Sequence, residues 1–70
     1  MNREPVNSSN LKSIGYDCQR LLLEIEFLSG GIYEYQGVPE HIHSQLMGAP
    51  SMGSFFYRFI KDKYPCNRIR

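Results

Sequence analysis

Hydrophobic and polar residues alternate along residues 21–28, LLLEIEFL, with apolar side chains at every odd position and two glutamates among the even ones. A period of two is typical of a β-strand that buries one of its faces. Residues 10–17, NLKSIGYD, predict a preceding strand, and a turn around residues 17–20 would join the two. This part of the chain therefore indicates paired antiparallel strands.

Two glycines follow the second strand and indicate a tight hairpin. Residues 29–31, SGG, predict a three-residue loop whose last residue, Gly31, takes the left-handed conformation that glycine adopts without steric cost. This loop leads into a third strand and places Phe27 opposite Tyr33. The same register places Glu26 opposite Glu34 on the water-facing side of the sheet, where screening by solvent weakens the repulsion between the two carboxylates.

Tyr33 and Tyr35 are separated by one residue, and this spacing admits two interpretations. The rings could form a platform for stacking nucleobases, or they could be buried on one face of the third strand. The predicted register groups them with apolar side chains, so we favour buried rings with hydroxyl groups at the rim of the core. The opposite face carries Glu24, Glu26 and Glu34, which is an unfavourable surface for a phosphate backbone.

The hydrophobic period lengthens to that of a helix in residues 38–50, VPEHIHSQLMGAP. Pro39 suits a first helical turn, and Gly48 suits a helix end. Ile42 and Leu46 lie four residues apart, so both fall on the apolar side of this helix.

A second helix is predicted in residues 51–65, SMGSFFYRFIKDKYP, with Ser51 as its N-cap and Pro65 as its stop. At about 100° per residue, five hydrophobic side chains fall in one arc. They are Met52, Phe55, Phe56, Phe59 and Ile60, and the opposite side carries Ser54, Tyr57, Arg58 and Lys61. We therefore predict an α+β fold, a three-stranded antiparallel β-meander packed on one face by two C-terminal helices.

Seventy residues suffice for one small domain, and 41% hydrophobic with 21% charged residues is typical of a folded, soluble protein. We expect a single domain over residues 1–70, with residues 1–9 and 66–70 loosely ordered. No apolar stretch approaches the roughly 20 residues of a membrane span, and the N-terminus lacks the hydrophobic core of a signal peptide. We therefore expect a cytoplasmic protein, without membrane partners, whose Cys18 and Cys66 are free thiols.

Charge is distributed unevenly along the chain, despite a formal net charge of +1. Residues 1–50 contain three basic and six acidic residues, whereas residues 51–70 contain five basic residues and one aspartate. The C-terminal excess of positive charge favours an anionic partner such as RNA, and an uneven solvated surface is the alternative. The candidate nucleic-acid-binding residues are Tyr57, Arg58, Lys61, Arg68 and Arg70.

Residue types used in catalysis and metal binding are present, but not at informative spacings. His41 and His43 are two residues apart and do not face each other on a helix, so we interpret them as surface or rim residues rather than metal ligands. Cys18 lies in a predicted turn, Cys66 lies in the tail, and nothing holds a base beside either thiol or beside Ser51. We expect no enzymatic activity, no metal and no cofactor.

The order of these segments resembles the KTSC domain family, named after a C-terminal domain of some lysyl-tRNA synthetases and also found as a short stand-alone bacterial protein. The resemblance runs through VNSSNLKSIGYD, LEIEF, YEYQGVPEHI, LMGAPSMGSFF and FIKDKY. The family's Tyr-x-Tyr motif corresponds to Tyr33 and Tyr35, and its Ser-x-Gly helix start corresponds to Ser51 and Gly53. We interpret these motif residues as structural.

The resemblance implies a domain of unassigned function, for which RNA binding is suggested by the synthetase that carries it. The family often has basic residues in the Ser-x-Gly segment where this chain has Met52 and Ser54, which weakens the case for a phosphate site at the helix start. Two hypotheses follow. One is an RNA-binding module acting through the basic C-terminal helix, and the other is a protein-docking module acting through the acidic sheet face or the helix tips.

Overall fold

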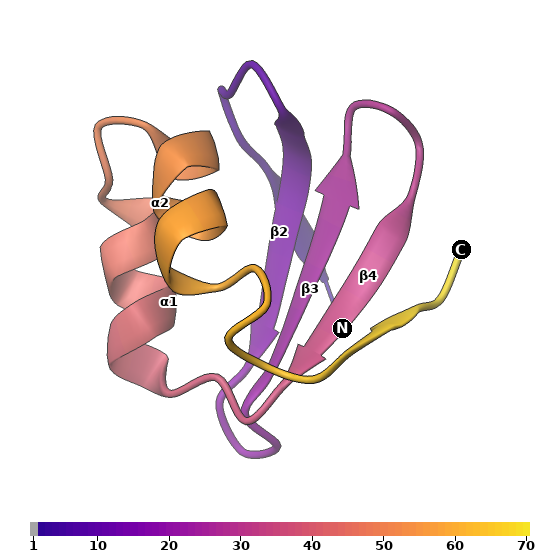
Figure 1. Ribbon diagram of the computed structural model, residues 1–70, viewed down its shortest axis with the longest axis vertical. Coiled ribbons are helices and arrows are strands. Elements are labelled where there is room, and N and C mark those ends of the chain that lie inside the picture. The colour runs from indigo at the N-terminus through magenta and orange to yellow at the C-terminus, as the bar shows by residue number, and fades with distance from the viewer. Residues whose placement is uncertain (1) are drawn as a thin grey trace.

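The computed structural model describes residues 2–70 and contains one antiparallel sheet with two helices on one of its faces (Figure 1). The strands lie side by side in chain order, each antiparallel to its neighbour. They are β1 (Arg3–Pro5), β2 (Leu11–Asp17), β3 (Leu22–Phe27), β4 (Ile32–Gln36) and β5 (Cys66–Arg68), and the helices are α1 (Glu40–Met47) and α2 (Met52–Phe59). The α+β class is confirmed, but the sheet of the described residues has five strands and not the predicted three.

The two edge strands, β1 and β5, are the ones that the sequence pattern did not predict. Each has three residues, which is too few for an alternating hydrophobic pattern, and all of β5 is exposed. We expected residues 1–9 and 66–70 to be loosely ordered, and each segment contains an edge strand that pairs with the sheet. The two helices therefore lie between β4 and β5 in the chain and not at its C-terminal end.

The hairpin between β3 and β4 turns through residues 28–30, because Phe27 and Gly31 form a hydrogen-bonded pair, so the loop lies one residue nearer the N-terminus than predicted. The Phe27 N–H donates to the Gly31 carbonyl at 2.9 Å, and the Gly30 N–H donates to the Phe27 carbonyl at 2.9 Å. Gly30, with a φ of 111°, takes the conformation predicted for Gly31. The predicted register is consequently wrong by two residues, since Ile25 and not Phe27 lies opposite Tyr33.

Because the register error is an even number of residues, every side chain of the hairpin keeps its predicted face. Tyr33 and Tyr35 both face the helices, and Tyr35 is only 4% exposed. On the other face Glu34 lies opposite Glu24 rather than Glu26. The prediction of inward-facing tyrosine rings is confirmed.

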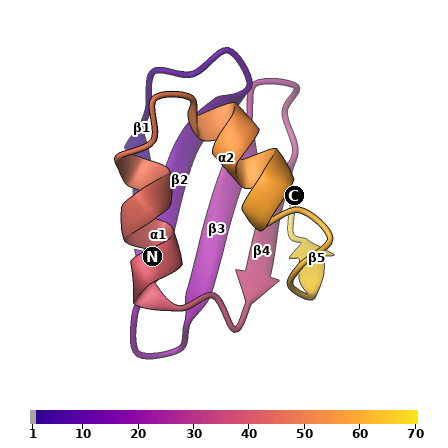
Figure 2. The ribbon, with the colours of Figure 1, turned by 60° about the vertical axis from the view of Figure 1, so that its left-hand side comes forward.

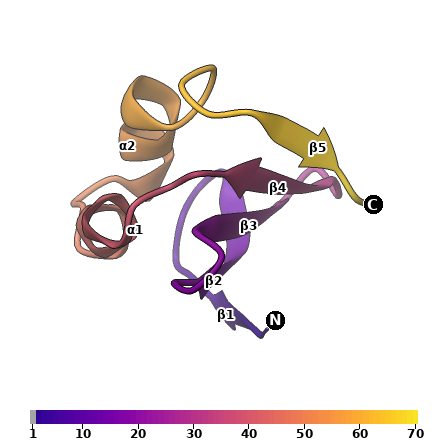
Figure 3. The ribbon, with the colours of Figure 1, turned by 90° about the horizontal axis from the view of Figure 1, so that it is seen from below.

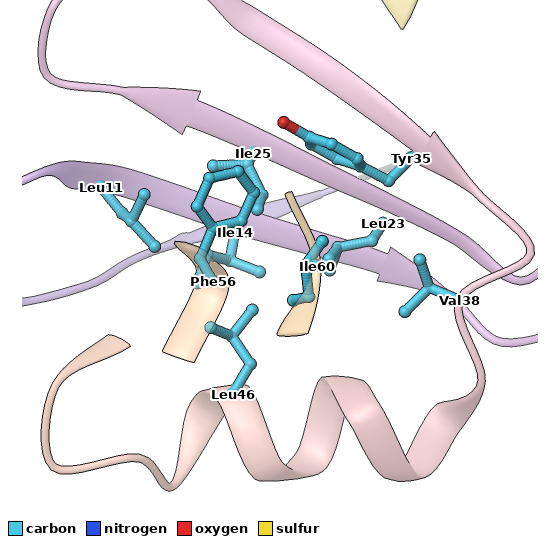
Figure 4. Packing of buried hydrophobic residues seen from close by; sticks show 9 residues of the cluster. All are labelled: Leu11, Ile14, Leu23, Ile25, Tyr35, Val38, Leu46, Phe56 and Ile60. Carbon is cyan, nitrogen blue, oxygen red and sulfur yellow. The ribbon is translucent and has the colours of Figure 1, made fainter. Parts of the chain in front are cut away.

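The core fills the space between the sheet and the two helices (Figure 4). α1 lies over β1 and β2, and α2 lies over β3 and β4 (Figure 2). Nine buried side chains form the core, and each large one stabilises the fold by about 1.5–3 kcal/mol. They are Leu11, Ile14, Leu23, Ile25, Tyr35, Val38, Leu46, Phe56 and Ile60. Across residues 2–70, no helix has the length and apolar character needed to cross a membrane.

α2 begins as predicted but ends earlier. The Ser51 hydroxyl oxygen accepts a hydrogen bond from the Ser54 N–H at 3.3 Å, which confirms the predicted N-cap. The helix ends at Phe59, before the stop expected at Pro65. Phe59 was predicted in the packed arc, yet it is 48% exposed, because the sheet contact is centred on the buried Phe56 and its neighbours.

The face of the sheet away from the helices is partly covered, although we predicted that its glutamates face water. The Arg3 guanidinium of β1 forms an ion pair with Glu24, and its Nε donates to the Ser13 hydroxyl at 3.2 Å. The Ser13 hydroxyl donates in turn to Glu26 at 2.9 Å. Glu24 is therefore only 7% exposed. Both ends of the described part of the chain lie on this side of the sheet, away from the helices (Figure 3).

Candidate nucleic-acid interface

The five candidate residues come from two segments of the chain, α2 with the turn after it and the C-terminal residues 68–70. Tyr57 and Arg58 lie on α2, Lys61 lies in the turn after it, and all three are exposed. Tyr57 separates two surface hollows, because it lines one together with Arg58 and the other together with Lys61. Arg68 lies in β5, and its Nε donates to the backbone carbonyl of Arg70 at 3.0 Å.

The first hollow lies at the start of α2 and gives the Ser-x-Gly motif a structural role. Ser51 caps the helix, and a Cβ on Gly53 would lie 3.4 Å from the Cβ of Asn10, so glycine lets the loop before β2 approach the helix closely. Arg58 is the cationic side chain of this hollow, and its guanidinium carbon lies 5.7 Å from the centroid of the Phe59 ring. The motif residues are therefore explained by packing and capping.

The second hollow, which we call the aromatic groove, lies between α2 and the β3–β4 hairpin and has a volume of about 500 Å³. Five of its lining residues are aromatic, and the others are polar or charged or contribute a thiol. The groove is lined by Asn10, Phe27, Ser29, Tyr33, Tyr35, Phe56, Tyr57, Lys61, Asp62 and Cys66. Tyr35 of the Tyr-x-Tyr motif thus belongs to the core, Tyr33 packs against it, and both form part of the wall of a surface groove.

Edge-to-face contacts hold the aromatic rings of the groove in place. The rings of Phe27 and Tyr33 meet at 5.6 Å and 79°, and those of Tyr35 and Phe56 meet at 5.5 Å and 74°. Phe27 also contacts Phe56 at 5.4 Å and 66°. Such pairs prefer this geometry because the positive ring edge meets the negative ring face. These contacts join the rings of the groove wall to one another.

Two cations lie against aromatic rings at the rim of the groove. The Lys61 Nζ lies 4.8 Å from the centroid of the Tyr57 ring, and the Arg68 guanidinium carbon lies 5.8 Å from the centroid of the Tyr33 ring. Tyr57 is 66% exposed, so its other surface is open to a ligand. The rim therefore offers positive charge beside accessible aromatic surface.

Tyr35 is the buried member of the motif pair, and its environment keeps its hydroxyl protonated. The pKa of Tyr35 is raised to about 12, mainly by burial and to a smaller extent by the nearby Cys66, Tyr33 and Asp62. A neutral phenol both donates and accepts hydrogen bonds. The Tyr35 hydroxyl is therefore a hydrogen-bond donor at neutral pH.

The two histidines that we interpreted as surface or rim residues differ in how far they are exposed. His41 is exposed, whereas the His43 ring stacks on Tyr16 with centroids 4.5 Å apart and planes at 9°. Burial lowers the pKa of His43, and the carboxylates of Glu4 and Glu40 oppose this shift. His43 thus holds α1 against β2 rather than lying free at the surface.

The sequence pattern did not predict the aromatic groove, although several of its lining residues were already candidates for other reasons. Tyr33, Tyr35 and the pair Tyr57 and Lys61 were noted for separate reasons, and nothing in their spacing showed that they share one surface. Cys66 was noted only as a thiol of the tail; both cysteines of the chain are free and exposed. The pairing of β5 with β4 brings Cys66 opposite Tyr35, so the missed strand explains the missed groove.

Comparison with known proteins assigns the chain to a family. The sequence model of the KTSC domain family matches residues 7–64 of this chain. A KTSC domain protein of Yersinia pestis, known from a crystal structure, is 48% identical and superposes with a TM-score of 0.96 over 99% of this chain and 97% of that chain. An uncharacterised protein of Stutzerimonas stutzeri is 39% identical over 64 residues, which are 91% of this chain and 90% of that protein.

A similar sequence also forms part of much larger enzymes. A lysine–tRNA ligase of Trichormus variabilis is 41% identical over 61 residues, which are 87% of this chain but 11% of the ligase. A ligase of Nostoc punctiforme is 43% identical over the same shares of both chains. The resemblance inferred from the motifs is confirmed, and this chain belongs to the KTSC domain family.

Proposed function

We propose that this protein is a small, non-enzymatic module that binds single-stranded RNA through the aromatic groove and its cationic rim. The observation that carries this proposal is the position of Lys61 beside the exposed ring of Tyr57, with Arg68 beside Tyr33. An exposed aromatic ring stacks on an unpaired base, while a neighbouring cation neutralises a phosphate. Both kinds of contact are available here within one surface.

The relatives support the same class of partner. The lysine–tRNA ligases that contain a similar domain act, by their name, on a tRNA. Lys61 and Arg68 belong to the positively charged C-terminal segment, whereas the face away from the helices carries three glutamates. The positive charge of this segment favours the approach of an RNA strand from the side of the aromatic groove.

The test is fluorescence anisotropy of labelled single-stranded RNA, titrated at several salt concentrations. Lys61→Ala should weaken binding to every RNA and reduce the slope of log K against log salt by about 1, and Tyr57→Ala should weaken binding by about 1–3 kcal/mol. Lys63→Ala is the matched control, because Lys63 is exposed nearby but does not line the groove. Unchanged affinity in the Lys61 and Tyr57 variants would exclude this function.

Protein docking is the second candidate function, and the exposure of Phe59 favours it. Phe59 is 48% exposed and its ring lies 4.8 Å from that of Phe55, which leaves apolar surface on α2. A docked protein should co-purify after nuclease treatment and be lost with Phe59→Ser, whereas an RNA-dependent complex should disappear with nuclease.

A further inference from the structure

Tyr35 has a hydroxyl group that the fold leaves without a partner. Only 4% of the residue is exposed, and the residue lines the aromatic groove. Within residues 2–70, no side-chain hydrogen bond involves the Tyr35 hydroxyl, and no fully buried side-chain oxygen or nitrogen lacks a partner, so this hydroxyl is not fully buried. The oxygen therefore reaches the open space of the groove. It is the one polar side-chain atom among the core residues drawn in Figure 4.

Asp62 supplies a second polar group to the same groove. It follows α2 in a left-handed backbone conformation, with a φ of 62°, and it lines the groove beside Lys61. Tyr35 and Asp62 thus line one groove, where the Asp62 carboxylate faces the same open space that the Tyr35 hydroxyl reaches. The groove thus combines one donor, the Tyr35 hydroxyl, with one two-oxygen acceptor, the Asp62 carboxylate, between aromatic walls.

The charges at the rim decide between two kinds of aromatic-groove ligand. Aromatic grooves with a carboxylate also suit cationic side chains such as those of lysine or arginine. In this protein Lys61 and Arg68 already lie against the Tyr57 and Tyr33 rings and repel a cationic ligand. A flat, neutral ring attached to an anionic chain fits these charges instead, and a nucleotide has this composition.

We propose that the aromatic groove receives one unpaired guanine of single-stranded RNA, with the Tyr35 hydroxyl donating to guanine O6 and the Asp62 carboxylate accepting from N1–H and the N2 amino group. This inference rests on the RNA-binding function proposed above and specifies which base the groove selects. Along one edge guanine presents the O6 acceptor, then the N1–H donor, then the N2 amino donor. The acceptor suits the Tyr35 hydroxyl, and the two donors suit the Asp62 carboxylate. A carboxylate can accept both donors at once.

The other bases leave a group of the site unmatched. Adenine presents a single donor beside the N1 lone pair, and cytosine presents a single donor beside two acceptors, so each places a lone pair against the Asp62 carboxylate. Uracil presents one donor between two acceptors and satisfies only one carboxylate oxygen. Leaving a buried polar group unpaired disfavours the wrong ligand more strongly than a missing apolar contact does.

The experiment compares short oligonucleotides of about nine nucleotides that differ at one central base in a uracil background. Wild-type protein should bind the guanine oligonucleotide about tenfold more tightly than the adenine one, and inosine, which lacks the N2 amino group, should fall between them. Tyr35→Phe and Asp62→Asn should each bring the affinities for guanine and adenine close together. Tyr35→Phe removes no hydrogen bond within the protein, so its thermal midpoint should match that of the wild type.

Lys61→Ala is the control variant, because losing a phosphate contact should weaken every oligonucleotide equally and leave the preference for guanine unchanged. Equal affinity of the wild type for guanine and adenine would overturn this inference and leave RNA binding intact. The absence of binding to any oligonucleotide would overturn both. Capture of an arginine-rich peptide that depends on Asp62 would assign the groove to a protein ligand and also overturn the inference.

Discussion

At the scale of single residues, the contact between Tyr16 and His43 ties the first helix to the sheet. The stacked rings join β2 to α1, and the Tyr16 hydroxyl donates to the Val38 carbonyl at 2.6 Å, just before the helix begins. Burial is the main cause that raises the pKa of Tyr16, so this donor stays protonated. Burial lowers the pKa of His43, so its ring is the member of the pair that gains a proton on acidification.

We predict that the protein loses stability on acidification because His43 must accept a proton. Since burial lowers its folded-state pKa, the stabilisation is complete above the unfolded value of 6.5 and is lost as the pH falls through the lower folded value. His43→Gln should remove this pH dependence and, by unstacking Tyr16, reduce the free energy of unfolding at neutral pH by about 1 kcal/mol. Urea unfolding at pH 7.5 and about pH 5 measures both effects.

His41→Gln is the matched control for this measurement, because His41 is exposed on the same helix. It should leave both the stability and its pH dependence close to those of the wild type. If His43→Gln keeps the full pH dependence of the wild type, another group is responsible.

At the scale of secondary structure, the start of α2 depends on one side chain. Helices this short are marginal by themselves, so the unpaired N–H groups of the first turn matter. Ser51→Ala removes the cap on the Ser54 N–H and should reduce the free energy of unfolding by about 1 kcal/mol. Ser54→Ala, at an exposed position that caps nothing, should change it by less than about 0.5 kcal/mol. Equal losses in the two variants, measured by urea unfolding, would contradict the capping role.

The elements that the sequence predicted are those long enough to show a period. The alternation in LLLEIEFL and the helical arc of α2 identified β3 and α2, whereas β1 and β5 have three residues each and show no period. The hairpin register was wrong because two adjacent glycines allowed either one to take the left-handed conformation. A Cβ at Gly31 would lie 2.9 Å from the Tyr33 ring, so Gly31 is needed for close packing while Gly30 forms the turn.

The candidate site was predictable only in parts, for the same physical reason. Tyr57 and Lys61 lie one turn apart on α2 and its end, so a helical period placed them together. Their proximity to the Tyr-x-Tyr motif depends on how α2 crosses the sheet and on the β4–β5 pairing. Contacts between segments so distant in the chain leave no local pattern from which to predict them.

At the scale of the whole molecule, the last strand covers part of the sheet that is otherwise open. The N–H of Ile32 donates to the Arg70 carbonyl at 3.0 Å, the Ile69 N–H donates to the Ile32 carbonyl at 2.8 Å, and Ile32 is 2% exposed. β5 also pairs with Tyr33 and Tyr35. The strand therefore stabilises β4 and one wall of the aromatic groove together.

We predict that deleting residues 66–70 destabilises the protein by about 2 kcal/mol or more, the contribution of burying Ile32, and promotes self-association. The deletion leaves the edge of β4 with unpaired N–H and carbonyl groups, which pair readily with another chain. Urea unfolding and analytical ultracentrifugation over a range of concentrations measure the two effects. The double substitution Arg68→Ala and Arg70→Ala is the control, since it keeps the backbone pairing. A truncated chain that stays monomeric with wild-type stability would contradict the role of β5.

The position of the two helices between β4 and β5 in the chain also determines when the sheet can be completed during synthesis. A ribosome releases the first four strands and both helices before the residues of β5, so the growing chain passes through a state in which β4 is an unprotected edge. That edge is closed only after residues 66–68 have left the ribosome. The nascent chain therefore exposes the backbone groups of β4 to other chains until β5 emerges.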